Sequence, residues 1–402
     1  VVFSEPPKTI DNVIRTETTE RIQKPIAKSN PILIQNCFIT PDMSTTKPSP
    51  TKLKRKDNIA TFVNICTVVT TTIFYITGLY FLLSIQELSN ENIFFPMCYA
   101  TIGFLLCTQS MIWSAYLHHE AAHSTLLFGS SVLGKKINRY SASLIDWMNG
   151  AIYFEFDELR RQHVLHHITK VDYAPSTDLM TGNCIPKLIA ASEYFYFPAY
   201  TLFLDWRSAF SPFWHPERQQ LKRQFRVIFF FCARLSLLCA FFDRSPLGAV
   251  LYLVSYCTMI NVVRFFDCFS HTYDIIPKGT KPNDGVRRNK EYDMKHTYSV
   301  YFKRPGSLIW VLNFLSLNFG FHNAHHFNTT VPWFQLPSVK SSIPVPESSY
   351  NIDPWGAMLQ YHKYRVSRLF HPPGAPKMTE NGLDLSEYIG IPDGAFLSLE
   401  VQ

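Results

Sequence analysis

The chain has 402 residues, of which 47% are apolar and 17% charged, against roughly 25% charged residues in an average soluble domain. This composition excludes an intrinsically disordered protein. The aromatic residues, 15% of the chain, lie in long apolar runs rather than among basic residues, so we expect no nucleic-acid partner. The net charge of +7 is more informative about membrane topology.

The first 57 residues are rich in proline, serine, threonine and lysine, and they end in a basic run from Lys52 to Lys56. Such a segment buries too little apolar surface to offset the entropy of ordering it. We therefore predict a mobile polar tail over residues 1–57.

Long apolar segments follow this tail. They predict four transmembrane helices, at about residues 59–85, 93–117, 227–242 and 247–266. The first two exceed the roughly 20 residues that cross a bilayer, and short connections join the four segments into two helical hairpins.

The distribution of charge around the first hairpin predicts its orientation. The flank before residue 59 is strongly basic, whereas the connection at residues 86–92 carries Glu87 and Glu91 and neither lysine nor arginine. By the positive-inside rule, the N-terminus and the region after the second span face the cytoplasm. Two weaker apolar stretches, residues 188–204 and 308–321, are expected at the interface or against the cytoplasmic part.

Ten of the 14 histidines are concentrated in four places, all on the predicted cytoplasmic side. On a helix, residues three and four apart share a face, so each cluster can direct its imidazoles to one point. The candidate metal ligands are His119, His123, His163, His166, His167, His271, His322, His325 and His326, together with Asp267, which lies one helical turn before His271.

This concentration of imidazoles predicts a metal centre. Burying nine histidines without partners is strongly unfavourable, and imidazole suits zinc, copper, iron and nickel alike. A zinc centre takes about four ligands, so the set is large enough for two metals. Two adjacent irons in a nitrogen-rich site suggest activation of O2 for attack on an unactivated C–H bond.

The residues resemble those of the membrane fatty acid desaturase and hydroxylase superfamily, whose members carry three histidine boxes and a further histidine. The segment from His119 to His123 resembles the first box, His163 to His167 the second, and His322 to His326 the third, while His271 resembles the additional ligand. The resemblance implies an all-α integral membrane protein, with four transmembrane helices in two hairpins and a cytoplasmic helical cap that holds a di-iron site.

The resemblance also implies the reaction. We expect O2-dependent oxidation of a fatty acyl chain, with desaturation as the leading reaction and hydroxylation or terminal-alkene-forming decarboxylation as alternatives. Two Fe ions would be the cofactor, and the electrons would come from ferredoxin or cytochrome b5 and an NAD(P)H reductase. The substrate would be a free fatty acid, an acyl-CoA or an acyl-lipid, and the sequence leaves this choice open.

Two features depart from the acyl-CoA desaturases of known structure. Those enzymes have an asparagine four positions before the additional histidine, and it reaches a metal through water; Asp267 stands there in this chain. The segment at residues 331–337 resembles a desaturase-like branch that includes terminal-alkene-forming decarboxylases.

Another reaction class fits part of the pattern. The segment from His119 to His123 also satisfies HExxH, in which two histidines bind zinc and the glutamate, here Glu120, is the general base of a metalloprotease. That reading leaves the other clustered histidines unexplained.

The resemblance and the apolar segments together predict the domain organisation. We expect a tail at residues 1–57, a desaturase-like membrane domain at residues 58–340 and a cytoplasmic extension at residues 341–402. The protein would lie in the endoplasmic reticulum if eukaryotic or in the inner membrane if bacterial.

Overall fold

The computed structural model describes residues 50–87, 93–126, 132–173, 185–214, 220–276, 288–380 and 382–391. The predicted polar tail lies outside the described residues as far as residue 49. Helix α1 begins at Pro50, so the last residues of the predicted tail are helical.

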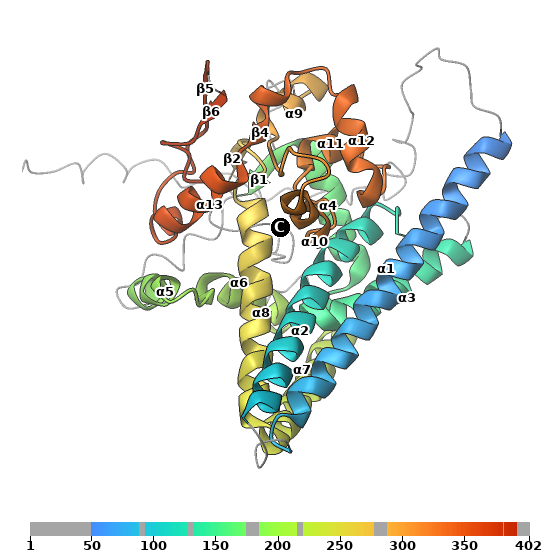
Figure 1. Ribbon diagram of the computed structural model, residues 1–402, viewed down its shortest axis with the longest axis vertical. Helices are drawn as coiled ribbons and strands as arrows, with labels where there is room; N and C mark the ends of the chain where they lie inside the picture. Colours follow the sequence, from blue (N-terminus) through green and yellow to red (C-terminus); the bar gives the residue numbers. More distant parts are fainter. Residues whose placement is uncertain are drawn as a thin grey trace, which may run out of the picture. The chain divides into compact units, whose positions relative to one another are not determined.

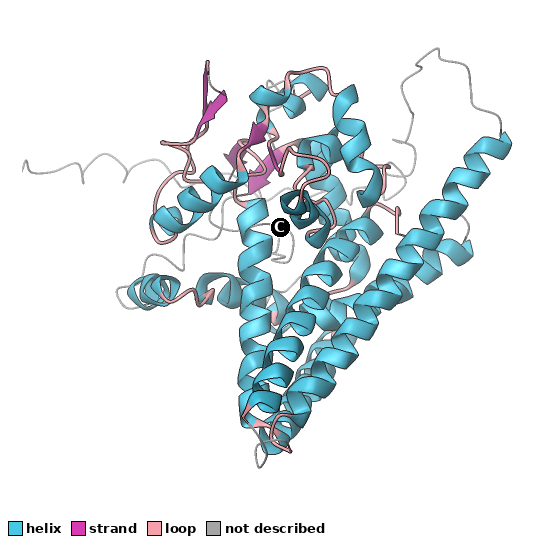
Figure 2. Cartoon of the chain, viewed as in Figure 1, coloured by secondary structure: helices cyan, strands magenta, loops and turns pink. Residues whose placement is uncertain are grey.

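Helices dominate the described chain (Figures 1 and 2). They are α1 (Pro50–Ser84), α2 (Phe94–Ala122), α3 (Val132–Asn149), α4 (Phe156–Thr169), α5 (Ile185–Tyr194), α6 (Ala199–Ala209), α7 (Leu221–Arg244), α8 (Pro246–Asp267), α9 (Lys290–His296), α10 (Val311–Leu315), α11 (His322–Phe327), α12 (Leu336–Val339) and α13 (Pro354–Lys363). Short 3₁₀ helices lie between them at η2 (Ala151–Tyr153), η4 (Ser211–Phe213), η6 (Leu308–Trp310), η7 (Trp333–Gln335), η8 (Lys340–Ser342), η9 (Glu347–Ser349) and η10 (Ser367–Leu369). The strands are β1 (Val171–Tyr173), β2 (Asp274–Ile276), β3 (Ser299–Val300), β4 (Asn351–Ile352), β5 (Lys377–Thr379) and β6 (Gly382–Asp384).

The four predicted spans are confirmed as helices that are long and apolar enough to cross a membrane. They are residues 59–84 of α1 and the whole of α2, α7 and α8. Helix α2 continues past the predicted end at Leu117 as far as Ala122. The first histidine box therefore begins on the spanning helix itself, and only His123 lies just past its end.

The second hairpin turns sharply between α7 and α8. Ser245 separates the two helices, and its hydroxyl accepts a hydrogen bond from the backbone N–H of Gly248 at 3.2 Å. Pro246 occupies the first position of α8, where its missing N–H is not needed. Helix α2 packs against both α1 and α8, so the two hairpins share one interface.

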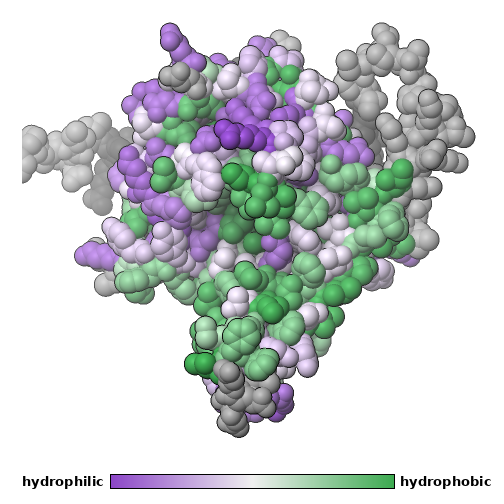
Figure 3. Space-filling model, viewed as in Figure 1, coloured by the Kyte–Doolittle hydropathy of each residue, from purple (hydrophilic) through white to green (hydrophobic). Residues whose placement is uncertain are grey.

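Large apolar side chains are exposed along all four spans. Examples are Phe62, Leu105, Phe229 and Leu247. Figure 3 shows hydrophobic residues over the helical hairpins and hydrophilic residues over the region that contains α9 and α12. Such extensive apolar exposure is unfavourable in water and is expected where lipid covers the protein.

Two small parallel sheets hold the remaining helices together. Strand β1, just after α4, pairs with β2, just after α8, and β3 pairs with β4. In addition, His271 and Thr297 form an isolated antiparallel bridge. These pairings bring the ends of α4 and α8 close to α9 and α11.

Candidate metal centre

The first box is positioned by the end of α2. His119 lies in its last turn, and His123 follows directly after the helix, with its backbone N–H donating to the carbonyl of His119 at 3.2 Å. Arg160 on α4 donates from Nε to the carbonyl of Ala122 at 2.9 Å. This bond satisfies a carbonyl at the end of α2 and fixes the first box against the helix that carries the second.

The second box lies on α4. Asp157 and Glu158 occupy the first turn of this helix, where negative charge is favourable, and Lys170 ends it in a left-handed conformation with φ of 50°. His163 and His167 are four residues apart and share one face. His166 lies on a different part of the surface, which allows α4 to supply both halves of a two-part site.

The third box lies on the short helix α11. Asn323 of this box donates from its side chain to the carbonyl of Thr297 at 2.6 Å, and its backbone N–H donates to Ser299 Oγ at 2.9 Å. Just before the helix, a Cβ on Gly320 would lie 2.1 Å from the carbonyl oxygen of Val300. Only glycine permits this close approach of the two backbones.

The structure brings eight of the predicted histidines into two groups, in each of which the candidate ligand atoms lie within 4.8 Å of one another. The first group is His119, His123, His163, His167 and His325, and the second is His166, His271 and His326. The ninth, His322, joins the second group, because its Nε2 lies 2.8 Å from Nε2 of His271.

The nitrogen atoms lie as close together as the ligands of one metal ion, or slightly closer. Nε2 of His163 lies 2.7 Å from that of His123 and 3.1 Å from that of His167, and His166 Nε2 lies 3.2 Å from His271 Nε2. Two nitrogens bound to one metal at about 2.1 Å lie roughly 3.0 to 3.4 Å apart at bond angles of about 90° to 109°. In each group, several neighbouring nitrogen atoms can therefore bind the same metal ion.

Burial keeps these imidazoles neutral. It lowers the pKa of His166 to about 4 and that of His322 to about 3, and it lowers the pKa of His123, His163 and His325 well below the usual value. Neighbouring histidines lower the pKa of His322, His123, His163 and His325 further, because one protonated ring disfavours a second. A neutral imidazole has the free lone pair that binds a metal.

Asp293 orients the ring of one candidate ligand, and Asp172 lies close to that of another; the sequence analysis missed both. Asp293 Oδ1 lies 3.1 Å from His326 Nδ1, and Asp172 Oδ1 lies 3.5 Å from His166 Nδ1. His326 Nε2 is buried and has no hydrogen-bond partner among the described residues. A carboxylate on one ring nitrogen and an open second nitrogen are typical of metal-binding histidines. The only signal in the sequence was that Asp172 closely follows the second box.

The glutamate of the HExxH pattern contacts other segments through one oxygen, while its Oε1 lies 3.9 Å from Nδ1 of His119. Glu120 is buried, and its Oε2 accepts hydrogen bonds from Thr125 Oγ1 at 2.8 Å and from the backbone N–H of Trp333 at 3.2 Å. The indole N–H of Trp333 donates to Asn64 Oδ1 at 3.0 Å. Glu120 therefore ties the end of α2 to the segment at residues 331–337, and it belongs to neither histidine group.

Asp267 and His118 belong to neither group of ligand atoms. Asp267 is the last residue of α8 and is buried, but its carboxylate is not a member of either group of ligand atoms. Arg264, one turn earlier, forms an ion pair with Glu193 at 2.9 Å. His118 is buried outside the groups, with Nδ1 2.5 Å from Asp146 Oδ1.

A sequence model of the fatty acid desaturase family matches residues 93–344, well over half of the chain. The chain belongs to the fatty acid desaturase family. The matched segment includes all three histidine boxes and His271, and it confirms the predicted superfamily. No curated protein matches the chain. Family membership makes the protein an oxidoreductase and, with its four apolar helices, indicates an integral membrane protein.

Proposed function

We propose that this desaturase-family protein introduces a double bond into a fatty acyl chain, using O2 and two irons. The convergence of nine histidines into two adjoining groups carries the proposal. One iron would be held by the first group, and the other by the second group with His322. Asp267, buried at the end of α8 four residues before His271, is a further candidate ligand of the second iron.

The irons, when bound, supply the oxidising power from O2 that breaks an unactivated C–H bond. The side chains of the protein keep the candidate ligands neutral and oriented before the irons bind. Burial holds the imidazoles neutral, and the hydrogen bond from His326 to Asp293 fixes the orientation of that ring. Because this orientation exists before the metal binds, little reorganisation is needed.

The reaction defines the partners. Desaturation removes two hydrogens from the acyl chain, and two external electrons with two protons complete the reduction of O2 to two waters. A ferredoxin or cytochrome b5, reduced by an NAD(P)H reductase, is the proposed donor. The charge asymmetry of the first hairpin supports a cytoplasmic position for the histidine centre, in the endoplasmic reticulum or the bacterial inner membrane.

The test is to express the chain with a reductase and carrier and to analyse cellular lipids and volatile hydrocarbons by mass spectrometry. New unsaturated acyl chains are expected. They should disappear in His325→Ala, which removes a member of the first group. They should persist in the matched variant His362→Ala, because His362 lies outside both groups and bonds instead with Tyr196.

Other products would contradict the proposed reaction while keeping the family. An acyl alcohol would indicate hydroxylation, and a terminal alkene would indicate decarboxylation. Purified protein that contains zinc in place of iron and hydrolyses peptides would instead support the metalloprotease reading.

A further inference from the structure

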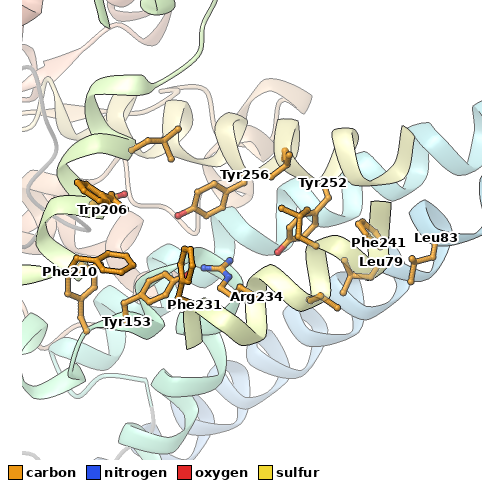
Figure 4. Close-up of a pocket in the computed structure, with 18 residues that line it drawn as sticks. Leu79, Leu83, Tyr153, Trp206, Phe210, Phe231, Arg234, Phe241, Tyr252 and Tyr256 are labelled. Atoms are coloured by element: carbon orange, nitrogen blue, oxygen red, sulfur yellow. The ribbon is translucent and has the colours of Figure 1, made fainter. Parts of the chain in front are cut away.

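A cavity of about 290 Å³ lies among the spanning helices, apart from the histidine groups. Its walls come from α1, α6, α7, α8 and the segment around η2 (Figure 4). Most lining side chains are apolar or aromatic, such as Leu79, Phe210 and Phe241. For comparison, an engineered cavity of about 150 Å³ in another protein holds benzene. The space is therefore large enough for a section of an alkyl chain.

One positively charged side chain, that of Arg234, lines this apolar cavity. Arg234 is near the middle of α7, roughly 20 Å from the first residue of that helix and 15 Å from its last. Figure 4 shows its guanidinium directed between Tyr256 and Phe231. An arginine at this depth in a spanning helix is rare and is associated with function.

Aromatic rings, not a carboxylate, surround this guanidinium. Its central carbon lies 5.6 Å from the ring centre of Trp147, and 5.8 Å from those of Tyr153 and Tyr256. Among the described residues, no carboxylate forms an ion pair with Arg234. Asp205 also lines this cavity. The aromatic faces stabilise the cation and leave its N–H donors available to an anion.

Tyrosine hydroxyl groups add hydrogen-bond donors to the part of the cavity that contains Arg234. Tyr153, Tyr252 and Tyr256 line the cavity with Arg234, and the hydroxyl of Tyr252 lies 3.0 Å from that of Tyr75. A Cβ on Gly150 would lie 2.2 Å from the hydroxyl oxygen of Tyr256. Glycine at this position, with φ of 89°, therefore makes room for the phenol. A guanidinium and nearby phenols together can donate hydrogen bonds to both oxygens of a carboxylate.

We propose that Arg234 binds the carboxylate of an unesterified fatty acid, whose alkyl chain occupies the apolar part of the cavity. A phospholipid headgroup stays near the membrane surface, whereas Arg234 lies roughly 20 Å and 15 Å from the two ends of α7. A thioester or ester linkage is itself uncharged and gives this guanidinium no carboxylate to bind, so the site selects the free acid.

Helix α8 connects the cavity with the region of the histidine centre. Tyr256 precedes Asp267 by eleven residues on this helix, which is roughly 17 Å along the helix axis, a distance that a long-chain fatty acid can span. The identification of the bound acid as the substrate rests on the proposed function. The binding of the acid at Arg234 does not.

The test measures equilibrium binding of radiolabelled hexadecanoate to the full chain in phosphatidylcholine nanodiscs, without reductase. Its uncharged methyl ester is the comparison ligand. Wild type should prefer the acid by at least about tenfold, and Arg234→Met should lose that preference while its affinity for the ester stays unchanged. Arg234→Lys should keep part of the preference, because it retains the charge.

One variant serves as a matched control, and a second tests the sign of the charge effect inside the cavity. Arg244→Met removes an exposed arginine of the same helix, which pairs with Glu87, and it should bind the acid like wild type. Asp205→Asn removes a negative charge from the same cavity, so it should bind the acid at least as tightly as wild type. Elution volume on size exclusion and the thermal midpoint confirm that each variant is folded.

Equal affinity of wild type for acid and ester would overturn the inference. So would an unchanged preference in Arg234→Met, or a loss in Asp205→Asn as large as that in Arg234→Met. The proposed function fails separately: acid binding without any acyl oxidation leaves the inference standing, whereas oxidation with no preference for the acid removes the inference alone.

Discussion

Asp293 Oδ1 lies 3.1 Å from Nδ1 of His326 and thereby leaves Nε2 of this ring open toward the second histidine group. The same oxygen accepts hydrogen bonds from the hydroxyls of Tyr273 and Thr297. A carboxylate held by three partners fixes both the orientation and the tautomer of its histidine.

Asp293→Asn is expected to weaken iron binding about 10- to 100-fold, because an amide orients the ring less strongly and makes it less basic. Iron retained per protein after dialysis against a graded series of chelator concentrations measures this effect. Asp274→Asn is the control, since Asp274 is half exposed and pairs with Arg288 outside the site. Equal iron retention in Asp293→Asn and wild type would contradict the role of Asp293.

Glu120 provides a test between oxidation and peptide hydrolysis. Glu120→Ala leaves the N–H of Trp333 and the hydroxyl of Thr125 without their acceptor, so we expect a loss of about 1 to 3 kcal/mol in the free energy of unfolding. Iron content and acyl oxidation should remain in the folded fraction. Chemical denaturation and elemental analysis measure the two effects. A stable variant that has lost all activity would favour a catalytic glutamate.

Asp267 and His271 should behave differently on mutation. His271→Ala removes a member of the second group and is expected to abolish activity. Asp267→Asn should keep iron but alter the rate or the product ratio, because it removes a negative charge that stabilises oxidised iron more than reduced iron. Turnover assays with product analysis make the measurement, and wild-type rate and products in Asp267→Asn would remove this residue from the site.

The stability of the metal-free protein should depend on pH. Folding lowers the pKa of His166 to about 4 and that of His322 to about 3, from the ordinary value of 6.5. Between pH 6.5 and about 4 the unfolded chain therefore binds more protons than the folded chain, and stability falls as the pH falls.

In that window each such histidine contributes a loss of up to roughly 1.4 kcal/mol per pH unit. Thermal unfolding of chelator-treated protein from pH 7.5 to 5 measures the trend. Replacing His322 with Phe should make the dependence shallower. A midpoint that does not change with pH would show that these rings are not buried as neutral groups.

The sequence by itself determined the four spans and the metal-ligand candidates. Runs of apolar residues are long enough to indicate spanning helices without any tertiary information, and the spacing of His163 and His167 on one helix already places them on one face. The local sequence pattern was less informative about where the helices end. Helix α2 continues to Ala122 because the segments that carry the other histidines pack around its last turn, which buries His119 and Glu120.

Only the tertiary structure decided how the histidines divide and what surrounds them. His325 joins the group of α2 and α4, while its neighbour His326 joins His271, because consecutive residues of α11 point in directions about 100° apart. Asp293 and Arg234 are not part of any motif found in the sequence. Their roles depend on contacts between segments far apart in the chain, and such contacts form only when the helices pack together.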